Sequence, residues 1–203
     1  MMKETEDYSL FLDTASKNLA LEILGKRYYY RVDLGNPKKS LERTHLGLEM
    51  AESALGITTK DIRAFYCLLG PGSNTGIRLG LTIPRTLYAF DPTIRLYGIG
   101  TLELFSLARE EAIACLSDRN GNLFLRLMEE GKIVERKVEK KDFATLPEGH
   151  YVIEDKDEKA KEALKGKDVL SVDVLALMVE KRESFEDFST REEQYLPRYA
   201  FAI

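Results

Sequence analysis

The chain has 203 residues and a mass of 23.1 kDa, enough for one large domain or two small lobes. The net charge of −4 argues against a general binder of nucleic acids or of membrane surfaces. The sequence has no apolar run long enough to span a bilayer. Without a basic-then-apolar leader, we expect a cytoplasmic protein. The two cysteines lie far apart in apolar runs and two histidines are too few for a histidine-built metal site, so we expect reduced, buried thiols and no bound metal.

Three apolar runs separated by turns open the chain and predict an antiparallel meander, with strands at 8–12, 18–24 and 26–34. Asp13 and Thr14 lie at the C-terminal end of the first strand. These side chains can cap their own turn, or they can bind a nucleotide phosphate or its magnesium ion. On the residues alone, the turn is the better interpretation.

The next segment predicts an amphipathic helix at 41–55, which Ser40 can cap and Gly56 stops. Its apolar side chains form two stripes, namely Leu41, Leu48 and Leu55, and then Leu46, Met50, Ala54 and Ile57. His45 lies at the edge of the first stripe, where a packed histidine is more common than a ligand.

The chain is organised around the stretch that follows, where an apolar strand at 62–69 turns through Gly70-Pro71-Gly72 into a helix at about 75–90. The two glycines permit backbone angles that side chains forbid, and Ser73 or Asn74 can cap the helix. Such a corner can hold an anion at the helix N-terminus, or it can simply turn a strand tightly into a helix. Geometry alone favours the tight turn.

The helix at 75–90 is apolar over an arc of roughly 200°, whereas a helix lying on one sheet usually buries about 100° or somewhat more. Its polar stripe carries Arg78, Thr82 and Arg85. We therefore expect this helix to be covered from two sides. Pro84 removes one helical hydrogen bond and predicts a kink.

A strand at 94–99 and a helix at 102–111, capped by Thr101, complete a βββαβα pattern, which predicts an N-terminal lobe at 1–100 and a reduced C-terminal lobe at 101–203. In the second lobe we expect strands at 113–116, 122–128, 132–138, 151–154 and 169–172, and helices at 156–164 and 173–182.

The helix entry at 70–80, Gly-Pro-Gly-Ser-Asn-Thr-Gly-Ile-Arg-Leu-Gly, resembles the motif Gly-Pro-Gly-Ser-Phe-Thr-Gly-Leu-Arg-Ile-Gly of the TsaB/YeaZ family. Asn74 is the one non-conservative departure. Leu12-Asp13-Thr14 and His45 match as well, although Leu46 and Gly47 replace the family's Ser-Glu. The resemblance spans about residues 8–128. It implies an α/β fold with two lobes, of the kind shared by actin, chaperone ATPases and sugar kinases.

Weaker similarities follow the helix. Thr101-Leu102-Glu103 resembles the family's Ser-Leu-Glu, and the turn at 119–124 resembles its Asp-Ala-Arg-x-Gly-Glu-Val-Tyr, with Arg119 on the arginine and Ser117 where the aspartate would stand. The segment at 194–199 faintly resembles the closing Pro-x-Tyr-Leu-Arg. If the second lobe closes over the first, Arg119 and the corner at 70–73 would share one cleft.

The family is the bacterial non-catalytic partner of the enzyme that builds threonylcarbamoyladenosine on tRNA. The resemblance therefore implies a scaffold subunit that docks on a catalytic TsaD-like paralogue, works with a small TsaE-like ATPase, contacts tRNA only indirectly and forms a homodimer when alone. No cofactor is required, and weak ATP or ADP binding in the complex would be compatible. Such binding would involve Asp13, Thr14, Gly70, Pro71, Gly72 and Ser73.

The resemblance also implies an interface in which the central helix and the helix at 41–55 pair with two helices of the partner. Its predicted residues are Leu46, Met50, Ile77, Arg78, Leu81, Arg85 and Tyr88, with Leu81 at the centre.

Two other functions stay open at this point. One is a kinase-like enzyme of the same superfold, which would use Asp13 and the glycine corner and would need a second phosphate loop. The C-terminal half offers no such loop, and neither His45 nor His150 has a partner four residues on to match the histidine pair of the catalytic paralogue. The other is a self-contained structural homodimer unrelated to tRNA.

Overall fold

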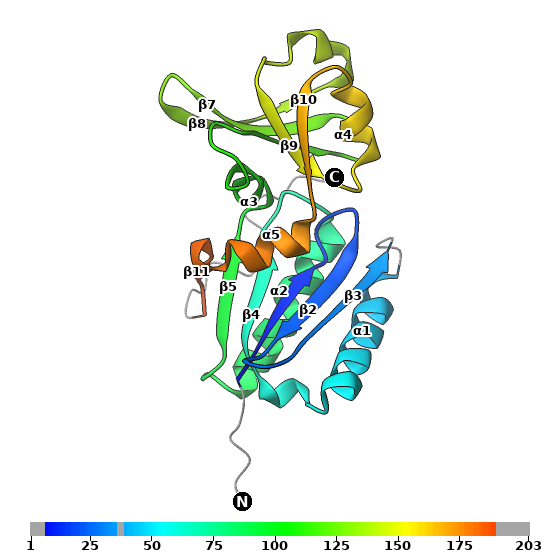
Figure 1. Ribbon diagram of the computed structural model, residues 1–203, viewed down its shortest axis with the longest axis vertical. Coiled ribbons are helices and arrows are strands. Elements are labelled where there is room, and N and C mark those ends of the chain that lie inside the picture. Colours follow the sequence, from blue (N-terminus) through cyan, green and yellow to red (C-terminus); the bar gives the residue numbers. More distant parts are fainter. Residues whose placement is uncertain (1–6, 36–38, 190–203) are drawn as a thin grey trace, which may run out of the picture.

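The computed structural model describes residues 7–35 and 39–189 (Figure 1). Within them the strands form a six-stranded sheet, in the order β11-β5-β4-β1-β2-β3, and a five-stranded sheet, in the order β10-β9-β6-β7-β8. Each sheet belongs to one lobe, and the two lobes lie one above the other along the long axis of the molecule. The predicted α/β fold with two lobes is confirmed.

The first lobe begins with the predicted meander. Strands β1 (Tyr8–Asp13), β2 (Leu19–Leu24) and β3 (Tyr29–Gly35) are antiparallel. On the other side of β1, β4 (Ile62–Leu68) and β5 (Arg95–Ile99) add in parallel. The C-terminal ends of β1, β4 and β5 therefore meet at the edge of the sheet that faces the second lobe (Figure 1).

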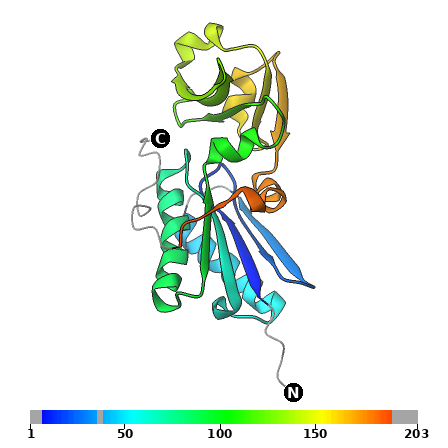
Figure 2. The same ribbon diagram turned by 90° about the vertical axis from the view of Figure 1, so that its left-hand side faces the viewer.

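Two long helices cover one face of this sheet. Helix α1 (Ser40–Leu55) packs on β2 and β3, and α2 (Asn74–Phe90) packs on β4 and β5. On the opposite face α5 (Val174–Glu180) lies against β1 and β2 (Figure 2). Both faces of the sheet are thus covered, which explains why β1 is buried at Leu10, Phe11 and Leu12.

The second lobe has an antiparallel part and a parallel part. Its antiparallel strands are β6 (Ile113–Ser117), β7 (Leu123–Glu129) and β8 (Lys132–Val138), and its parallel strands are β9 (His150–Glu154) and β10 (Asp168–Val172). Helix α4 (Glu158–Ala163) packs on β6, and the 3₁₀ helix η2 (Lys140–Thr145) follows β8.

The chain then returns to the first lobe. After α5 and the 3₁₀ helix η3 (Arg182–Ser184), β11 (Glu186–Asp187) pairs antiparallel with β5. The division at residue 100 had assigned this segment to the second lobe, and the pairing with β5 corrects that assignment. The first lobe is therefore built from both halves of the sequence.

Two predicted helix starts are corrected by the structure. Lys39, in a left-handed conformation with φ of 60°, precedes α1 and makes no side-chain cap, so Ser40 is a buried helical residue and not the cap. Helix α3 (Thr101–Ser106) begins after Gly100 and is much shorter than expected, because the chain turns toward β6 and Glu111 takes a positive φ of 53°.

Several local predictions are confirmed. Helix α1 ends at Leu55 as predicted, with Gly56 following in a left-handed conformation. The 3₁₀ helix η1 (Thr59–Asp61) leads into β4. Cys67 and Cys115 are free and buried, and burial raises the pKa of the Cys67 thiol to about 12. No helix within the described ranges is long and apolar enough to cross a membrane. The segment at 194–199 lies outside the described residues.

Candidate functional site

The glycine corner at residues 70–73 joins β4 to α2. Its side-chain and main-chain groups form hydrogen bonds within the chain. Ser73 Oγ accepts a hydrogen bond of 3.2 Å from the Gly76 amide, so Ser73 is the N-cap of α2. The Thr101 amide donates to the Gly70 carbonyl over 2.8 Å, and the Leu69 amide donates to the Ile99 carbonyl over 2.9 Å. The corner therefore ties the ends of β4 and β5 together.

The loop after β1 fits into the same corner. The Ser73 amide donates to the Ala15 carbonyl over 2.7 Å, and Thr14 Oγ1 donates to the Gly76 carbonyl over 2.7 Å. A Cβ atom at Gly72 would lie 2.5 Å from the Ala15 carbonyl oxygen. The motif is glycine-rich here because the backbone of the β1–β2 loop approaches the backbone of α2 directly.

Asp13 caps its own turn. Its Oδ1 accepts from the amides of Ala15 and Ser16, both at 3.1 Å, and its Oδ2 accepts from Ser16 Oγ at 2.5 Å. Burial raises the pKa of Asp13 to about 6, although these hydrogen bonds lower it. The Asp13 carboxylate, the Thr14 hydroxyl and the Ser73 amide are thus all engaged inside the chain. Phosphate binding by these residues stays a prediction.

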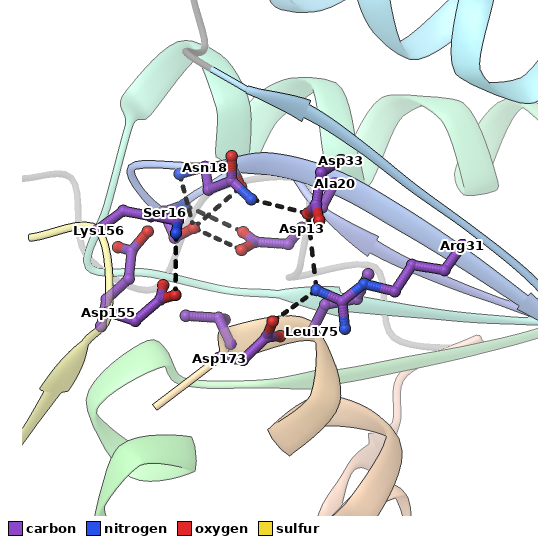
Figure 3. Close-up of a pocket in the computed structure, with 12 residues that line it drawn as sticks. Asp13, Ser16, Asn18, Ala20, Arg31, Asp33, Asp155, Lys156, Asp173 and Leu175 are labelled. Carbon is purple, nitrogen blue, oxygen red and sulfur yellow. Dashed lines mark hydrogen bonds and ion pairs between the residues drawn. The ribbon is translucent and has the colours of Figure 1, made fainter. Parts of the chain in front are cut away.

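A small polar cavity of about 60 Å³ lies between the lobes, beside Asp13 (Figure 3). Figure 3 shows Asp13 turned toward Ser16 and Arg31 reaching Asp173, and the Arg31–Asp173 ion pair measures 2.6 Å. The volume of the cavity is well below the roughly 300–1,000 Å³ of sites that enclose small organic ligands. In this conformation the cavity has room for water molecules and not for a nucleotide.

Lys17 connects the two lobes next to this cavity. Its amide donates to both carboxylate oxygens of Glu154, each at 2.9 Å, and its ammonium group donates to the Ser117 carbonyl over 2.6 Å. Glu154 is fully buried, and burial followed by the nearby Asp13 charge raises its pKa to about 8. We call Lys17, Ser117 and Glu154 the interlobe contact. Sequence reasoning did not find it, because Lys17 lies 100 positions from Ser117 and 137 positions from Glu154 in the chain.

Helix α1 presents three of its large apolar side chains, Leu41, Leu46 and Met50, to solvent, while Leu48 and Leu55 pack partly against the core. The side that packs on the sheet consists of the small residues Ser40, Thr44, Gly47 and Ala51. A Cβ atom at Gly47 would lie 2.8 Å from Leu34 Cδ1, so helix and sheet are in close contact there. Leu46 is 51% exposed and Met50 is 42% exposed, as the predicted interface requires.

Helix α2 contributes less to that surface than predicted. Ile77, Leu81 and Arg85 are buried within the chain itself, and the Arg85 guanidinium lies 5.2 Å from the centre of the Phe188 ring. The return of the chain along β5, which the sequence did not reveal, is what brings Phe188 there. Leu81 is therefore buried in the isolated chain, although with Arg78 and Arg85 it lines an open hollow of about 620 Å³ along α2, and its place at the centre of an interface stays a prediction. Arg78 is exposed and Tyr88 is half-buried.

Two exposed apolar residues on the same helices were not among the predicted interface residues. Leu41 on α1 is 63% exposed and Phe90 at the end of α2 is 85% exposed. We use the name α1–α2 surface for these two residues together with Leu46 and Met50. Apolar residues that periodicity alone would assign to the core are here accessible.

The remaining candidates lie apart from the corner. Arg119 is exposed on the β6–β7 turn, where its carbonyl accepts a hydrogen bond from Lys159 Nζ, and its approach to the corner at 70–73 stays a prediction. His45 is exposed and lies 3.3 Å from Glu49. Across the described ranges, no three histidine, cysteine, aspartate or glutamate side chains are grouped so that they could hold a metal ion.

Comparison with solved structures places the chain among proteins of the YeaZ fold. YeaZ from Pseudomonas aeruginosa aligns with a TM-score of 0.67 and 14% sequence identity, over 95% of this chain and 99% of that one. A protein described as similar to the peptidase YeaZ from Pseudomonas aeruginosa aligns with a TM-score of 0.66 and 16% identity, over the same shares. The fold implied by the helix-entry motif is thereby confirmed.

Sequence comparison finds relatives without a described function. The uncharacterized protein MG208 of Mycoplasma genitalium is 29% identical over 142 residues, which cover 68% of this chain and 72% of that protein. Its homologue in Mycoplasma pneumoniae is 31% identical over 106 residues, covering 51% of this chain and 54% of that protein. No protein-family model matches the chain.

Proposed function

We propose that this chain belongs to the TsaB/YeaZ family and is the non-catalytic partner of the threonylcarbamoyltransferase that modifies adenosine-37 of tRNA. The observation that carries the proposal is the helix entry at 70–80, whose motif resembles the family's and whose glycines hold the β1–β2 loop against α2 in a YeaZ fold. In this proposal the motif builds a rigid platform for a partner.

The chemistry of the interlobe region supports a scaffold over an enzyme. A kinase-like reaction needs free hydrogen-bond donors that can bind the phosphate groups, and it needs a space for the nucleotide between the lobes. Here the Ser73 amide and the Thr14 hydroxyl are bonded to the chain itself, and the cavity beside Asp13 measures about 60 Å³. Lys17 and Glu154 also hold the lobes together at this point. No specific observation favours the kinase-like reaction.

The α1–α2 surface supports docking on another protein. Its four apolar side chains, Leu41, Leu46, Met50 and Phe90, are between 42% and 85% exposed in the isolated chain. Apolar groups of this kind on two neighbouring helices gain free energy when a partner removes them from water. We propose a catalytic TsaD-like paralogue as that partner, a second copy of this chain as its substitute when the paralogue is absent, and a TsaE-like ATPase as a third component.

Reconstitution with the catalytic subunit from the same genome tests the proposal. We expect the tagged chain to capture that subunit, and we expect the modified nucleoside to form on a tRNA transcript only when both proteins are present. Omission of either protein is the control. Modification by the catalytic subunit alone at the full rate, or failure of the two proteins to associate, would overturn the proposal.

The isolated chain should not be an enzyme. We expect it to hydrolyse ATP far more slowly than the median enzymatic rate of about 10 per second, and we expect no cleavage of peptides. A sensitive phosphate-release assay on a preparation freed of contaminating ATPases checks this. Turnover near the median rate that is retained through a second chromatographic step would contradict the scaffold proposal.

A further inference from the structure

An open hollow of about 430 Å³ lies in the second lobe, away from the α1–α2 surface. It is formed by the β6–β7 turn, η2 and α4, which lie together at the upper end of the molecule (Figure 1). The lining residues are Gly121, Lys140, Phe143, Lys159, Glu162 and Ala163.

Two lysines converge on one glycine in this hollow. A Cβ atom at Gly121 would lie 2.5 Å from Lys140 Cε and 3.8 Å from Lys159 Cδ, so both side chains lie over the turn. Lys159 Nζ donates to the Arg119 carbonyl, which places a third cationic residue on the same turn. We call Arg119, Lys140 and Lys159, together with Phe143, the Gly121 patch.

The charges of this patch are not neutralised as those nearby are. Within the described ranges, neither the Arg119 guanidinium nor the Lys140 or Lys159 ammonium lies within 4.0 Å of a carboxylate. Five other lysines of the lobe have such partners, in the pairs Lys137–Asp118, Lys141–Glu139, Lys156–Asp155, Lys161–Glu158 and Lys167–Glu148, whereas Lys132 and Lys165 have none among the described residues. Lys140 on η2 and Lys159 on α4 place two like charges over a turn that also carries Arg119, and a bound polyanion would relieve the repulsion between them.

The geometry points to a single-stranded RNA segment as the ligand: we propose that the Gly121 patch contacts its phosphates through the three cations and stacks one base on Phe143. Phe143 is half-buried and lines the hollow, so an aromatic ring stands beside the cationic groups. Cations beside an aromatic side chain form the usual binding surface for single-stranded nucleic acid. The choice of RNA over DNA rests on the proposed function, and the direct contact proposed here goes beyond the indirect contact with tRNA that the family resemblance implies.

The charge of the patch is tested by the variant Arg119→Gln/Lys140→Gln. Both side chains are exposed and lie outside the two cores, so the variant should fold as the wild type does. The matched control is Lys60→Gln/Lys132→Gln, which removes the same charge from exposed positions on η1 and at the β7–β8 hairpin. A third variant, Lys140→Arg, keeps the charge and should retain binding.

The measurement is fluorescence anisotropy of a labelled single-stranded oligouridylate between about 50 and 200 mM salt. Loss of two phosphate contacts should lower the slope of log K against log salt by roughly 1.4 and weaken binding at least about fivefold at the low-salt end, while the control variant binds as the wild type does. Phe143→Leu should weaken binding without changing the slope, since it removes stacking and no charge.

Three results would overturn the proposal: no binding of the oligouridylate by the wild type, equal weakening by the control variant, or displacement by inorganic phosphate at concentrations equimolar with the RNA phosphates. Capture of the catalytic subunit by Arg119→Gln/Lys140→Gln is measured in parallel. Normal capture with unchanged RNA binding refutes the Gly121 patch alone, whereas failure of the wild type to capture the subunit refutes the proposed function.

Discussion

Gly76 occupies the place where the first loop and the central helix approach each other most closely. A Cβ atom there would lie 1.7 Å from the carbonyl oxygen of Thr14, which is main chain and cannot rotate away. The neighbouring Thr75 is exposed on the same turn of α2. Two adjacent positions therefore differ completely in the side chain that they can accept.

We expect Gly76→Ala to lower the free energy of unfolding by about 3 kcal/mol or more, because either the loop or the helix must shift to accommodate the methyl group. Thr75→Ala, the matched control, should change it by less than about 0.5 kcal/mol. Urea unfolding followed by circular dichroism measures both. Equal stabilities for the two variants would show that the loop yields easily and that the glycine is not required by packing.

Glu154 makes the stability of the protein depend on pH. Its folded-state pKa of about 8 lies above the ordinary value of 4.5, so the folded chain holds a proton that the unfolded chain releases. The associated stabilisation is complete below about pH 4.5 and is lost as the pH rises through 8. Asp13, with a folded-state pKa of about 6, adds a decline of the same sign between pH 3.8 and 6.

We therefore expect the free energy of unfolding of the wild type to fall between pH 6 and pH 9, and we expect Glu154→Gln to remove most of that decline, since the amide cannot ionise. Unfolding in urea at a series of pH values measures it. Glu183→Gln, at a side chain that is 91% exposed, is the control and should keep the wild-type decline. A Glu154→Gln profile parallel to that of the wild type would contradict the high pKa of Glu154.

The two helices on the outer face of the first sheet differ in what they bury. Helix α1 turns small residues toward the sheet and leaves Leu46 and Met50 exposed, whereas α2 buries Ile77 and Leu81. A charge introduced into the two helices should therefore have opposite consequences for folding.

Leu81→Asp should unfold the chain or destabilise it by several kcal/mol, because it places an unpaired carboxylate in the core. Leu46→Asp/Met50→Asp should leave the stability within about 1 kcal/mol of the wild type, since about half of each residue is exposed and the new carboxylates can stay in water. Thermal unfolding distinguishes them. A folded, stable Leu81→Asp variant would show that this residue is accessible after all.

Local signals were sufficient to predict the end of α1 and the glycine corner, and to narrow the cap of α2 to Ser73 or Asn74, because each depends on residues within one turn of the chain. Which side of α1 is buried could not be predicted from the sequence. Leu41 and Leu48 share a stripe, yet Leu41 is exposed and Leu48 is half-buried, because Gly47 determines how closely the helix meets Leu34 on β3.

Long-range pairing is the part of the fold that the sequence did not reveal. Strand β11 has two residues, too few for a periodic pattern, and it is stabilised by pairing with β5. Its position brings Phe188 against Arg85 and helps to bury the centre of the predicted interface. The interlobe contact between Lys17 and Glu154 is likewise formed by residues 137 positions apart.

The whole molecule is a pair of lobes joined by α3, by the interlobe contact and by the returning segment at 174–187. Its polar interlobe cavity is small, α1 and α2 carry exposed apolar side chains, and two lysines converge on the β6–β7 turn at the far end of the second lobe. Such a surface is better suited to a subunit that positions other molecules than to an enzyme that encloses a substrate.

Sedimentation velocity of the chain mixed with the catalytic subunit tests docking through the α1–α2 surface most directly. An interface of standard size buries about 1,600 Å², and loss of a central contact costs roughly 2 kcal/mol or more, a weakening of about thirtyfold. We expect the wild type and the control Met128→Asp/Ile133→Asp, which alters two exposed residues of the β7–β8 hairpin, to form the complex, and Leu46→Asp/Met50→Asp to sediment as separate proteins. A complex that forms equally well with Leu46→Asp/Met50→Asp would contradict the account.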